Sequence, residues 1–248
     1  MSDLDITSKF QHFDGNLIKV DEHVIHSERA RQYFIDALAD IPKAFNQTVM
    51  YVGKNNKQCD DDNTCPLLVK TEDGHEFSCD VILDCTYNQL QLQNLSCTYE
   101  ITISLLYKQI RPANFDAITV MDGKFFSLYP RDLHHDLYSL TDVEYSPLIS
   151  AQTYAEIADF KLTSEHFERV KKQMEDKVQY YFPQFNEYFQ YESFFLSTKT
   201  KLNSMSDSRE TSIQIIDSDI ISVHCGKIYG IFEWEDYVVQ HLDNKINV

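Results

Sequence analysis

Glycine is scarce in this sequence: only six of the 248 residues are glycine, spread from Gly15 to Gly230. No group of them has the G-x-G-x-x-G spacing that holds a dinucleotide pyrophosphate, and the phosphate-binding pattern G-x-x-x-x-G-K-[ST] is also absent. Neither a complete dinucleotide fingerprint nor a P-loop is therefore present in this stretch of sequence.

Positive charge and long apolar runs are also lacking. The 22 Lys and Arg residues stand against 39 Asp and Glu, a net charge of −17. Nucleic acids and anionic membrane surfaces require clustered Lys and Arg, so neither is an expected partner. No 18-residue apolar run suggests a transmembrane helix, and residues 1–10 lack the apolar core of a signal peptide. We therefore expect a cytoplasmic protein.

The six cysteines show no metal-binding pattern, because neither C-x-x-C nor another zinc spacing occurs. With no visible export signal, we expect them to be reduced thiols. The triplet His134-His135-Asp136 groups three possible ligands. However, adjacent side chains of a strand point to opposite faces, and no further ligand has matching spacing. No metal site is expected.

Apolar residues in the first third follow helix and strand periodicities. Ser27 is a candidate N-cap, and the apolar stripe after it predicts an amphipathic helix that ends near Pro42. The stripe consists of Ala30, Tyr33, Phe34, Ala37, Leu38 and Ile41. Strands are expected over residues 17–20 and 48–52, a hairpin over 67–71 and 75–78, and a buried parallel strand over 80–86.

The middle of the chain changes character. Alternating apolar residues predict strands over 99–109, 117–121, 125–129 and 137–140, with a tight turn at Asp122-Gly123, and therefore an antiparallel sheet. A helical stripe follows and ends at Pro183; it consists of Phe167, Val170, Met174, Val178 and Tyr181. Further strands are expected over 194–198, 211–216 and 220–224.

A strand–glycine–helix junction lies near the end of the chain. The apolar strand 220–224 runs to Gly226, and an amphipathic helix over Tyr229 to Leu242 follows. A helix N-terminus presents unpaired N–H groups and a partial positive charge, and glycine lets a ligand approach the backbone. Such a junction can hold a phosphate, a cofactor or an oxyanion, although a connection that binds nothing has the same pattern.

The order of these patterns predicts the fold class. An α/β part is followed by an antiparallel sheet with a helix, and the chain then returns to α/β, which indicates an α/β (mixed α+β) chain with an inserted domain. We place the boundaries at 1–95 for the first α/β part, 96–192 for the inserted sheet and helix, and 193–248 for the return. No Gly/Ser/Pro-rich linker separates these parts.

The same order resembles FAD-dependent oxidoreductases of the D-amino-acid-oxidase-like class. Four segments carry the resemblance: DEHVIHSERARQYFIDAL, EDGHEFSCDVILDCTYN, ITVMDGKFFSLYPRD and SDSRETSIQIIDSDIISVHCGKIYGIF. The second is similar to the family stretch that leads into the interdomain crossing, and the last to the segment that closes over the flavin. The likeness runs from about Leu17 to Leu242. The family's N-terminal strand–G-x-G-x-x-G–helix unit has no counterpart here.

The resemblance implies a partial FAD-binding-like layer, a truncated Rossmann part, interrupted by an antiparallel-sheet substrate domain. It implies an amine- or amino-acid-oxidase type of reaction on a small-molecule substrate. The backbone of Gly226, Lys227 and Ile228 would contact the flavin, and a separate chain could supply the missing dinucleotide-binding unit. The alternative is a non-catalytic binding or assembly module that retains the fold without the cofactor.

Three side chains are catalytic candidates within this resemblance. Arg209 could hold an anionic substrate group through a bidentate contact, or pair with a neighbouring carboxylate in a turn. Lys199 could lie at the flavin edge, or be a solvated lysine at the edge of a sheet. Tyr129 lies on a strand expected to face the site, but most of the 15 tyrosines must be core or surface residues.

Overall fold

The computed structural model of this chain describes residues 10, 18, 20, 25–56, 59, 65–113, 115–121, 124–203, 211–217, 219–226 and 230–246. The chain forms two compact units. Unit 1 comprises residues 1–41, 100–151 and 155–199, and unit 2 comprises residues 42–99, 152–154 and 200–248.

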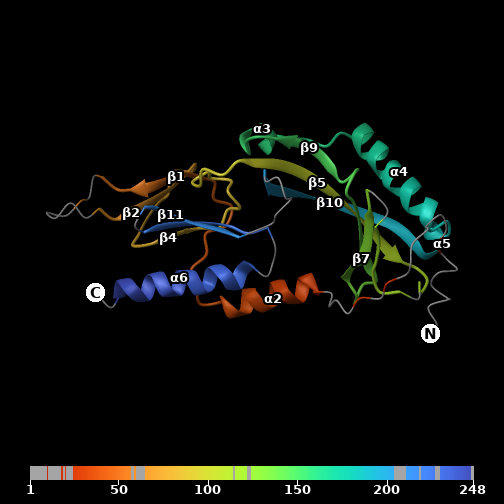
Figure 1. The fold of residues 1–248 in the computed structure, drawn as a ribbon, viewed down its shortest axis with the longest axis horizontal. Helices are drawn as coiled ribbons and strands as arrows, with labels where there is room; N and C mark the ends of the chain where they lie inside the picture. The colour runs from red at the N-terminus through yellow and green to blue at the C-terminus, as the bar shows by residue number, and fades with distance from the viewer. Residues whose placement is uncertain are drawn as a thin grey trace. The chain divides into compact units, whose positions relative to one another are not determined.

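Helices and strands alternate irregularly along the chain (Figure 1). In order they are α2 (Ser27–Ala37), β1 (Val49–Lys54), β2 (Leu67–Thr71), β3 (Glu76–Cys79), β4 (Ile82–Asp84), β5 (Cys97–Gln109), β6 (Ile118–Val120), β7 (Phe126–Asp132), β8 (Leu137–Asp142), β9 (Pro147–Ala151), α3 (Ala155–Ala158), α4 (Ser164–Tyr181), α5 (Phe185–Tyr188), β10 (Phe189–Leu202), β11 (Ser212–Asp217), β12 (Ile220–His224) and α6 (Gly230–Ile246).

The largest sheet has the strand order β10-β5-β8-β7-β6, with β9 paired to β5. The pairs β5–β8, β7–β8 and β6–β7 are antiparallel, which confirms the sheet predicted from the alternating pattern. Strand β9 was not expected, and β10 begins at Phe189 instead of residue 194. The predicted turn residues Asp122 and Gly123 lie outside the described residues.

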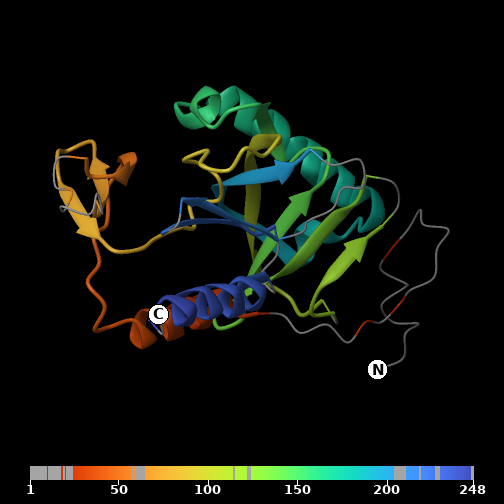
Figure 2. The same cartoon turned by 60° about the vertical axis from the view of Figure 1, so that its left-hand side comes forward.

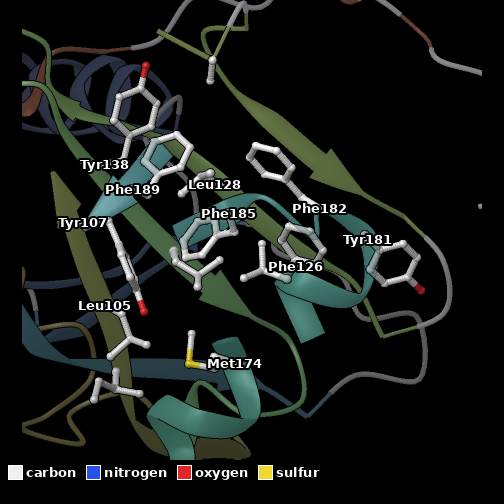
Figure 3. Packing of buried hydrophobic residues seen from close by; sticks show 14 of the residues in the cluster. Leu105, Tyr107, Phe126, Leu128, Tyr138, Met174, Tyr181, Phe182, Phe185 and Phe189 are labelled. Atoms are coloured by element: carbon white, nitrogen blue, oxygen red, sulfur yellow. The ribbon is translucent and has the colours of Figure 1, made fainter. Parts of the chain in front are cut away.

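The core of unit 1 lies between this sheet and α4 (Figure 3). The helix buries Val170, Met174, Val178 and Tyr181, as its spacing predicts. Aromatic rings fill most of the remaining space. The Phe185 ring, for example, lies 4.9 Å from the ring of Tyr107 and 5.3 Å from that of Phe189. Burying rings of this size contributes much of the stability of a small core.

Unit 2 contains two small sheets. The antiparallel sheet β1-β2-β3 includes the predicted hairpin. The second sheet has the order β11-β12-β4, and β4 is parallel to β12, as the apolar run before residue 86 predicts. Helix α6 packs on this sheet through Val238, which contacts Ile221 and Val223 (Figure 2). On its other face, Ile82 and Ile220 pack against Leu67 of the hairpin.

Helix α2 differs from the prediction in its cap, its end and its burial. His26, not Ser27, is the N-cap: its Nδ1 accepts a hydrogen bond from the backbone N–H of Arg29. The helix ends at Ala37, so Leu38 and Ile41 of the predicted apolar stripe lie beyond it. None of its side chains is buried, and Tyr33 and Phe34 of the apolar stripe are 68% and 53% exposed. Periodicity predicted the helix, but not what covers its apolar face.

Two further expectations need correction. Ile18 and Val20 lie outside any strand, and the other two residues of the predicted strand 17–20 lie outside the described residues. Cys59 and Cys65 are joined by a disulfide, so the expectation of reduced thiols is wrong for this pair. Their Cα atoms approach to 4.1 Å in a polar loop, a proximity that sequence spacing alone does not reveal.

Candidate functional site

The parallel pair β4–β12 brings two segments to one edge of the sheet. Ile220 pairs with Ile82 and Ser222 with Asp84, so the two strands end side by side. The residues that follow Asp84 and those that follow His224 therefore leave the same edge. In open α/β sheets ligands bind outside the carboxyl ends of parallel strands. This edge, which we call the β4–β12 edge, is the candidate site of unit 2.

A buried carboxylate fixes the geometry of the β4–β12 edge. Asp84 Oδ2 accepts a 2.6 Å hydrogen bond from the Ser222 hydroxyl, which links the two strands through their side chains. Asp84 Oδ1 accepts from the backbone N–H of Thr86 at 3.0 Å and from its hydroxyl at 2.7 Å. The carboxylate thus sets both the strand register and the start of the turn after β4.

A buried glutamine joins the third strand to this network. Gln93 Nε2 donates to the carbonyl of Ser222 at 2.5 Å, and Gln93 Oε1 accepts from the hydroxyl of Ser212 at 2.9 Å. Because Ser212 begins β11, one side chain connects β11 and β12 to the segment after β4. A fully satisfied buried network of this kind rigidifies its surroundings.

His224 lies at the end of β12 and is only 1% exposed. Its ring stacks on Tyr87, with 4.8 Å between the ring centroids and 14° between the planes. Its Nδ1 is buried and has no hydrogen-bond partner. Burial lowers the pKa of His224 below its ordinary value, so the neutral imidazole is the form present near pH 7.

The turn after β4 contains strained backbone. Tyr87 and Asn88 have φ angles of 61° and 59°, in the left-handed region that non-glycine residues seldom occupy. The hydroxyl of Thr200 donates to the Tyr87 carbonyl at 2.9 Å, and the hydroxyl of Tyr99 donates to the Asn88 carbonyl at 2.9 Å. The Asn88 side-chain oxygen is buried without a partner. Strain held by surrounding contacts is typical of functional sites.

Replacing His224 by phenylalanine should weaken the acid sensitivity of unit 2. In the unfolded chain His224 binds a proton below about pH 6.5. In the folded chain the pKa of His224 is lower, so the ring stays neutral there. The free energy of unfolding therefore decreases as the pH falls below about 6.5. Between pH 7.5 and 5.5 this loss is at most about 1.4 kcal/mol. His224→Phe keeps a ring against Tyr87 and should abolish the loss.

Urea unfolding measured by Trp234 fluorescence tests this prediction, because the single tryptophan lies on α6 in unit 2. The free energy of unfolding should fall more on acidification in the wild-type protein than in His224→Phe. A constant difference between the two proteins at pH 7.5 does not affect this comparison. An equal loss of stability in both proteins on acidification would contradict it.

The structure places three of the six residues predicted for the site. Gly226 follows β12 in unit 2 and is half-buried. Tyr129 on β7 and Lys199 on β10 belong to unit 1. Arg209, Lys227 and Ile228 lie outside the described residues. The structure therefore gives Gly226 a defined position at the β4–β12 edge.

Sequence reasoning did not assign a role to the polar residues of this edge. Asp84, Asn88, Gln93, Ser222 and His224 are buried, and Tyr87, which stacks on His224, is half-buried. One signal was available: Asp84 and Ser222 interrupt two otherwise apolar strands that are expected to be buried. A buried polar side chain needs a hydrogen-bond partner. Because Asp84 and Ser222 lie on two neighbouring strands, each can be the partner of the other.

Within the described part of the chain, no group of His, Cys, Asp and Glu residues could hold a metal ion. No helix among the same residues is long and apolar enough to cross a bilayer.

Comparison with known proteins identifies relatives of the chain, although no protein-family model matches it. The FAD-dependent monooxygenase FPY4 of Fusarium mangiferae is 27% identical over 234 residues, which are 94% of this chain and 58% of that protein. This chain thus spans less than two thirds of the length of its curated relative.

Two oxidases are among the solved structures that are similar to the chain. A modified fructosyl peptide oxidase from Aspergillus nidulans matches with a TM-score of 0.51 and 15% identity, over 79% of this chain and 49% of the oxidase. Glycine oxidase from Geobacillus kaustophilus matches with a TM-score of 0.49 and 7% identity, over 72% of this chain and 43% of that enzyme. The chain shares its mixed α+β fold with the fructosyl peptide oxidase, and its sequence is similar to that of an FAD-dependent monooxygenase. Both findings fit the class that the sequence resembles, the D-amino-acid-oxidase-like FAD-dependent oxidoreductases.

Proposed function

We propose that this chain is the substrate domain and flavin-closing part of an FAD-dependent oxidoreductase of amine- or amino-acid-oxidase type. The β4–β12 edge carries the proposal, because it joins two parallel strand ends, a strained turn and a glycine at one place. The similarity to an FAD-dependent monooxygenase over 94% of the chain supports the assignment of the cofactor.

The residues of the edge suit the flavin end of FAD. Two buried polar atoms without partners, Nδ1 of His224 and Oδ1 of Asn88, are available to polar groups of a bound ring. Gly226 has no side chain to block close approach of a ring to the backbone. We assign the backbone N–H groups of Gly226, Lys227 and Ile228 to the flavin carbonyls, where donors stabilise the negative charge of the reduced ring. When bound, the flavin supplies the hydride chemistry.

The residues of this chain do not suit the pyrophosphate end of FAD, since the sequence has no glycine-rich phosphate loop. Strand β4 is the last strand of its sheet in the described residues, and Leu83 on it is exposed. Parallel sheets are ordinarily buried on both faces, and an open strand edge can pair with another strand. We therefore propose that a dinucleotide-binding unit, in the same polypeptide or in a separate chain, pairs with β4.

Residues 96–192, which hold most of the antiparallel sheet, are the proposed substrate domain, and 1–95 and 193–248 are the proposed truncated Rossmann part; the compact unit around the sheet also includes residues 1–41. We keep Arg209 as the candidate that would hold an anionic group of a small-molecule substrate, and Lys199 and Tyr129 of unit 1 as separate catalytic candidates. Tyr107 on β5 is buried, and its hydroxyl donates to Glu175 at 2.8 Å. It belongs to the core of unit 1 and has no part in this proposal.

Binding of FAD to the purified chain is the first test. We expect added FAD to be retained through gel filtration, with flavin absorbance near about 450 nm. Gly226→Val should weaken the affinity at least about tenfold, because its side chain occupies the space of the ring. Gly53→Val on β1, in the other sheet of unit 2, is the matched control: the exposed side chain of Tyr51 has to move to make room for it, and the affinity should be unchanged.

The outcome also separates the possible forms of the proposal. Retention of FAD only after co-expression with a chain that contains G-x-G-x-x-G would support a split enzyme. A colourless protein that binds no FAD in either experiment would contradict the proposal and favour the non-catalytic module. Equal FAD affinity of Gly226→Val and wild type would remove the junction from the site.

A further inference from the structure

The antiparallel sheet of unit 1 has two faces of different chemistry. One face carries the apolar core, including Phe126, Leu128, Tyr138 and Leu140, and packs against α4 (Figure 3). Successive side chains of a strand point to opposite faces, so the residues that alternate with these core residues lie on the second face. We call it the hydroxyl face, and it is formed by Thr102, Thr119, Ser127, Tyr129, Ser139 and Thr141.

The strand register arranges these side chains in rows across the sheet. Thr119 pairs with Ser127 and Ser127 with Thr141, so three neighbouring strands carry a hydroxyl at the same level. The hydroxyl oxygens of Thr119 and Ser127 are 3.0 Å apart. In the next row Tyr129 pairs with Ser139. The two rows therefore present several hydroxyl groups, and none of these five side chains carries a charge at neutral pH.

Ser139 is the buried member of these rows. It is only 1% exposed, and within the described part of the chain its hydroxyl has no hydrogen-bond partner. Native proteins satisfy nearly all buried polar groups, because a buried hydroxyl without a partner is unfavourable. The side chain of its row neighbour Tyr129 is 39% exposed, and exposed side chains change rotamer rapidly. When Tyr129 turns aside, a ligand hydroxyl can reach Ser139.

A cation lies over the same face. The guanidinium carbon of Arg131 on β7 is 4.2 Å from the centroid of the Phe195 ring on β10. Phe194 packs on Phe167 of α4, so its neighbour Phe195 points to the hydroxyl face. Because β8 and β5 lie between β7 and β10, the contact between Arg131 and Phe195 extends over this face.

The guanidinium of Arg131 is available to an anion. A guanidinium stacked on a ring keeps its N–H donors, two of which can bind one carboxylate. Among the described residues Arg131 has no ion pair, because the adjacent carboxylate of Asp132 contacts His135 at 2.7 Å and His26 at 3.4 Å. The chain has a net charge of −17, so a bound anion needs a local cation. Arg131 supplies that charge on the hydroxyl face.

We propose that the hydroxyl face binds a small organic anion that carries several hydroxyl groups. Its carboxylate would bind Arg131, and its hydroxyls would bind the two rows that contain Ser139 and Ser127. Ser127, Tyr129 and Arg131 alternate along β7 and extend over about 13 Å. A chain of about six carbons with a hydrogen bond at each end spans this distance. That this ligand is the substrate rests on the proposed function, whereas its binding to the sheet does not require FAD.

Calorimetric titration of the full chain without FAD tests the site with gluconate, sorbitol and hexanoate. Sorbitol has the hydroxyls of gluconate but no carboxylate, and hexanoate has the carboxylate but no hydroxyls. Gluconate should bind at least about tenfold more tightly than either, because each of the others loses one set of hydrogen bonds. No detectable binding of gluconate, or equal affinity for gluconate and hexanoate, would overturn the proposal.

Two variants assign the contacts to residues. Arg131→Gln should weaken gluconate binding at least about tenfold, and the same substitution at the exposed Arg169 on α4 is the matched control, which should leave it unchanged. Ser139→Ala removes a hydroxyl without a partner, so it should weaken the binding of gluconate and sorbitol about threefold without lowering the urea midpoint. Wild-type gluconate affinity in folded Arg131→Gln, verified by circular dichroism, would overturn the proposal.

The titration also separates this inference from the proposed function. A chain that binds gluconate but retains no FAD, alone or with a G-x-G-x-x-G partner, would support the hydroxyl face and contradict the flavin assignment. A chain that retains FAD but does not bind gluconate would overturn the inference about the hydroxyl face alone.

Discussion

Replacing Asp142 by alanine should lower the free energy of unfolding of unit 1 by about 3–5 kcal/mol, the cost of breaking a buried ion pair. Asp142 is buried at the end of β8, and its Oδ2 lies 2.8 Å from Lys177 Nζ on α4. Its Oδ1 also accepts from the backbone N–H groups of Glu144 and Tyr145 at 2.7 and 2.9 Å. Alanine leaves an ammonium group and two N–H groups without this partner.

Urea unfolding followed by far-UV circular dichroism measures the effect. Lys172→Met is the matched control: its ion pair with Asp176 lies on the same helix but is exposed, so its loss should cost less than about 1 kcal/mol. Combining Asp142→Ala with Lys177→Met should recover part of the loss, because the unpaired buried charge is removed. A cost of Asp142→Ala within 1 kcal/mol of that of Lys172→Met would contradict the prediction.

Elements whose pattern reflects a buried face could be predicted from the sequence. The stripe of α4 places Val170, Met174 and Val178 on one side of the helix, and these are the side chains that the sheet covers. The continuous apolar run at Ile82 predicted a buried parallel strand, and β4 is parallel to β12. In both cases the local period determines which side chains face the core.

Other features depend on contacts that the local pattern does not contain. The stripe of α2 has the same helical period as that of α4, yet it is exposed, because period does not determine what lies opposite. The disulfide between Cys59 and Cys65 depends on the path of a polar loop. At the candidate site, the sequence indicated Gly226 but not its partner strand. The hydrogen bond between Ser222 and Asp84 joins residues 138 positions apart.

The largest effect at the site should come from Asp84. Asp84→Ala removes the acceptor for the Ser222 hydroxyl and for both the N–H and the hydroxyl of Thr86. Hydrogen bonds to a charged group contribute about 1.5–3 kcal/mol each, and removal of the desolvated carboxylate offsets part of this. We expect unit 2 to lose about 3 kcal/mol of unfolding free energy, measured by urea unfolding with Trp234 fluorescence.

Two further variants separate the strand link from the turn. Asp84→Asn retains an oxygen for Thr86, and its amide can donate to the Ser222 hydroxyl, so its cost should be about 1 kcal/mol. Ser222→Ala removes the link between the strands but leaves the Thr86 contacts. If the carboxylate positions the strained turn, Asp84→Ala should abolish retention of FAD, whereas Asp84→Asn and Ser222→Ala should preserve it. Equal free energies of unfolding for Asp84→Ala and Asp84→Asn would contradict this prediction. They would show that the hydrogen bonds of Thr86 to residue 84 contribute little, and that other contacts hold the backbone of Tyr87 and Asn88.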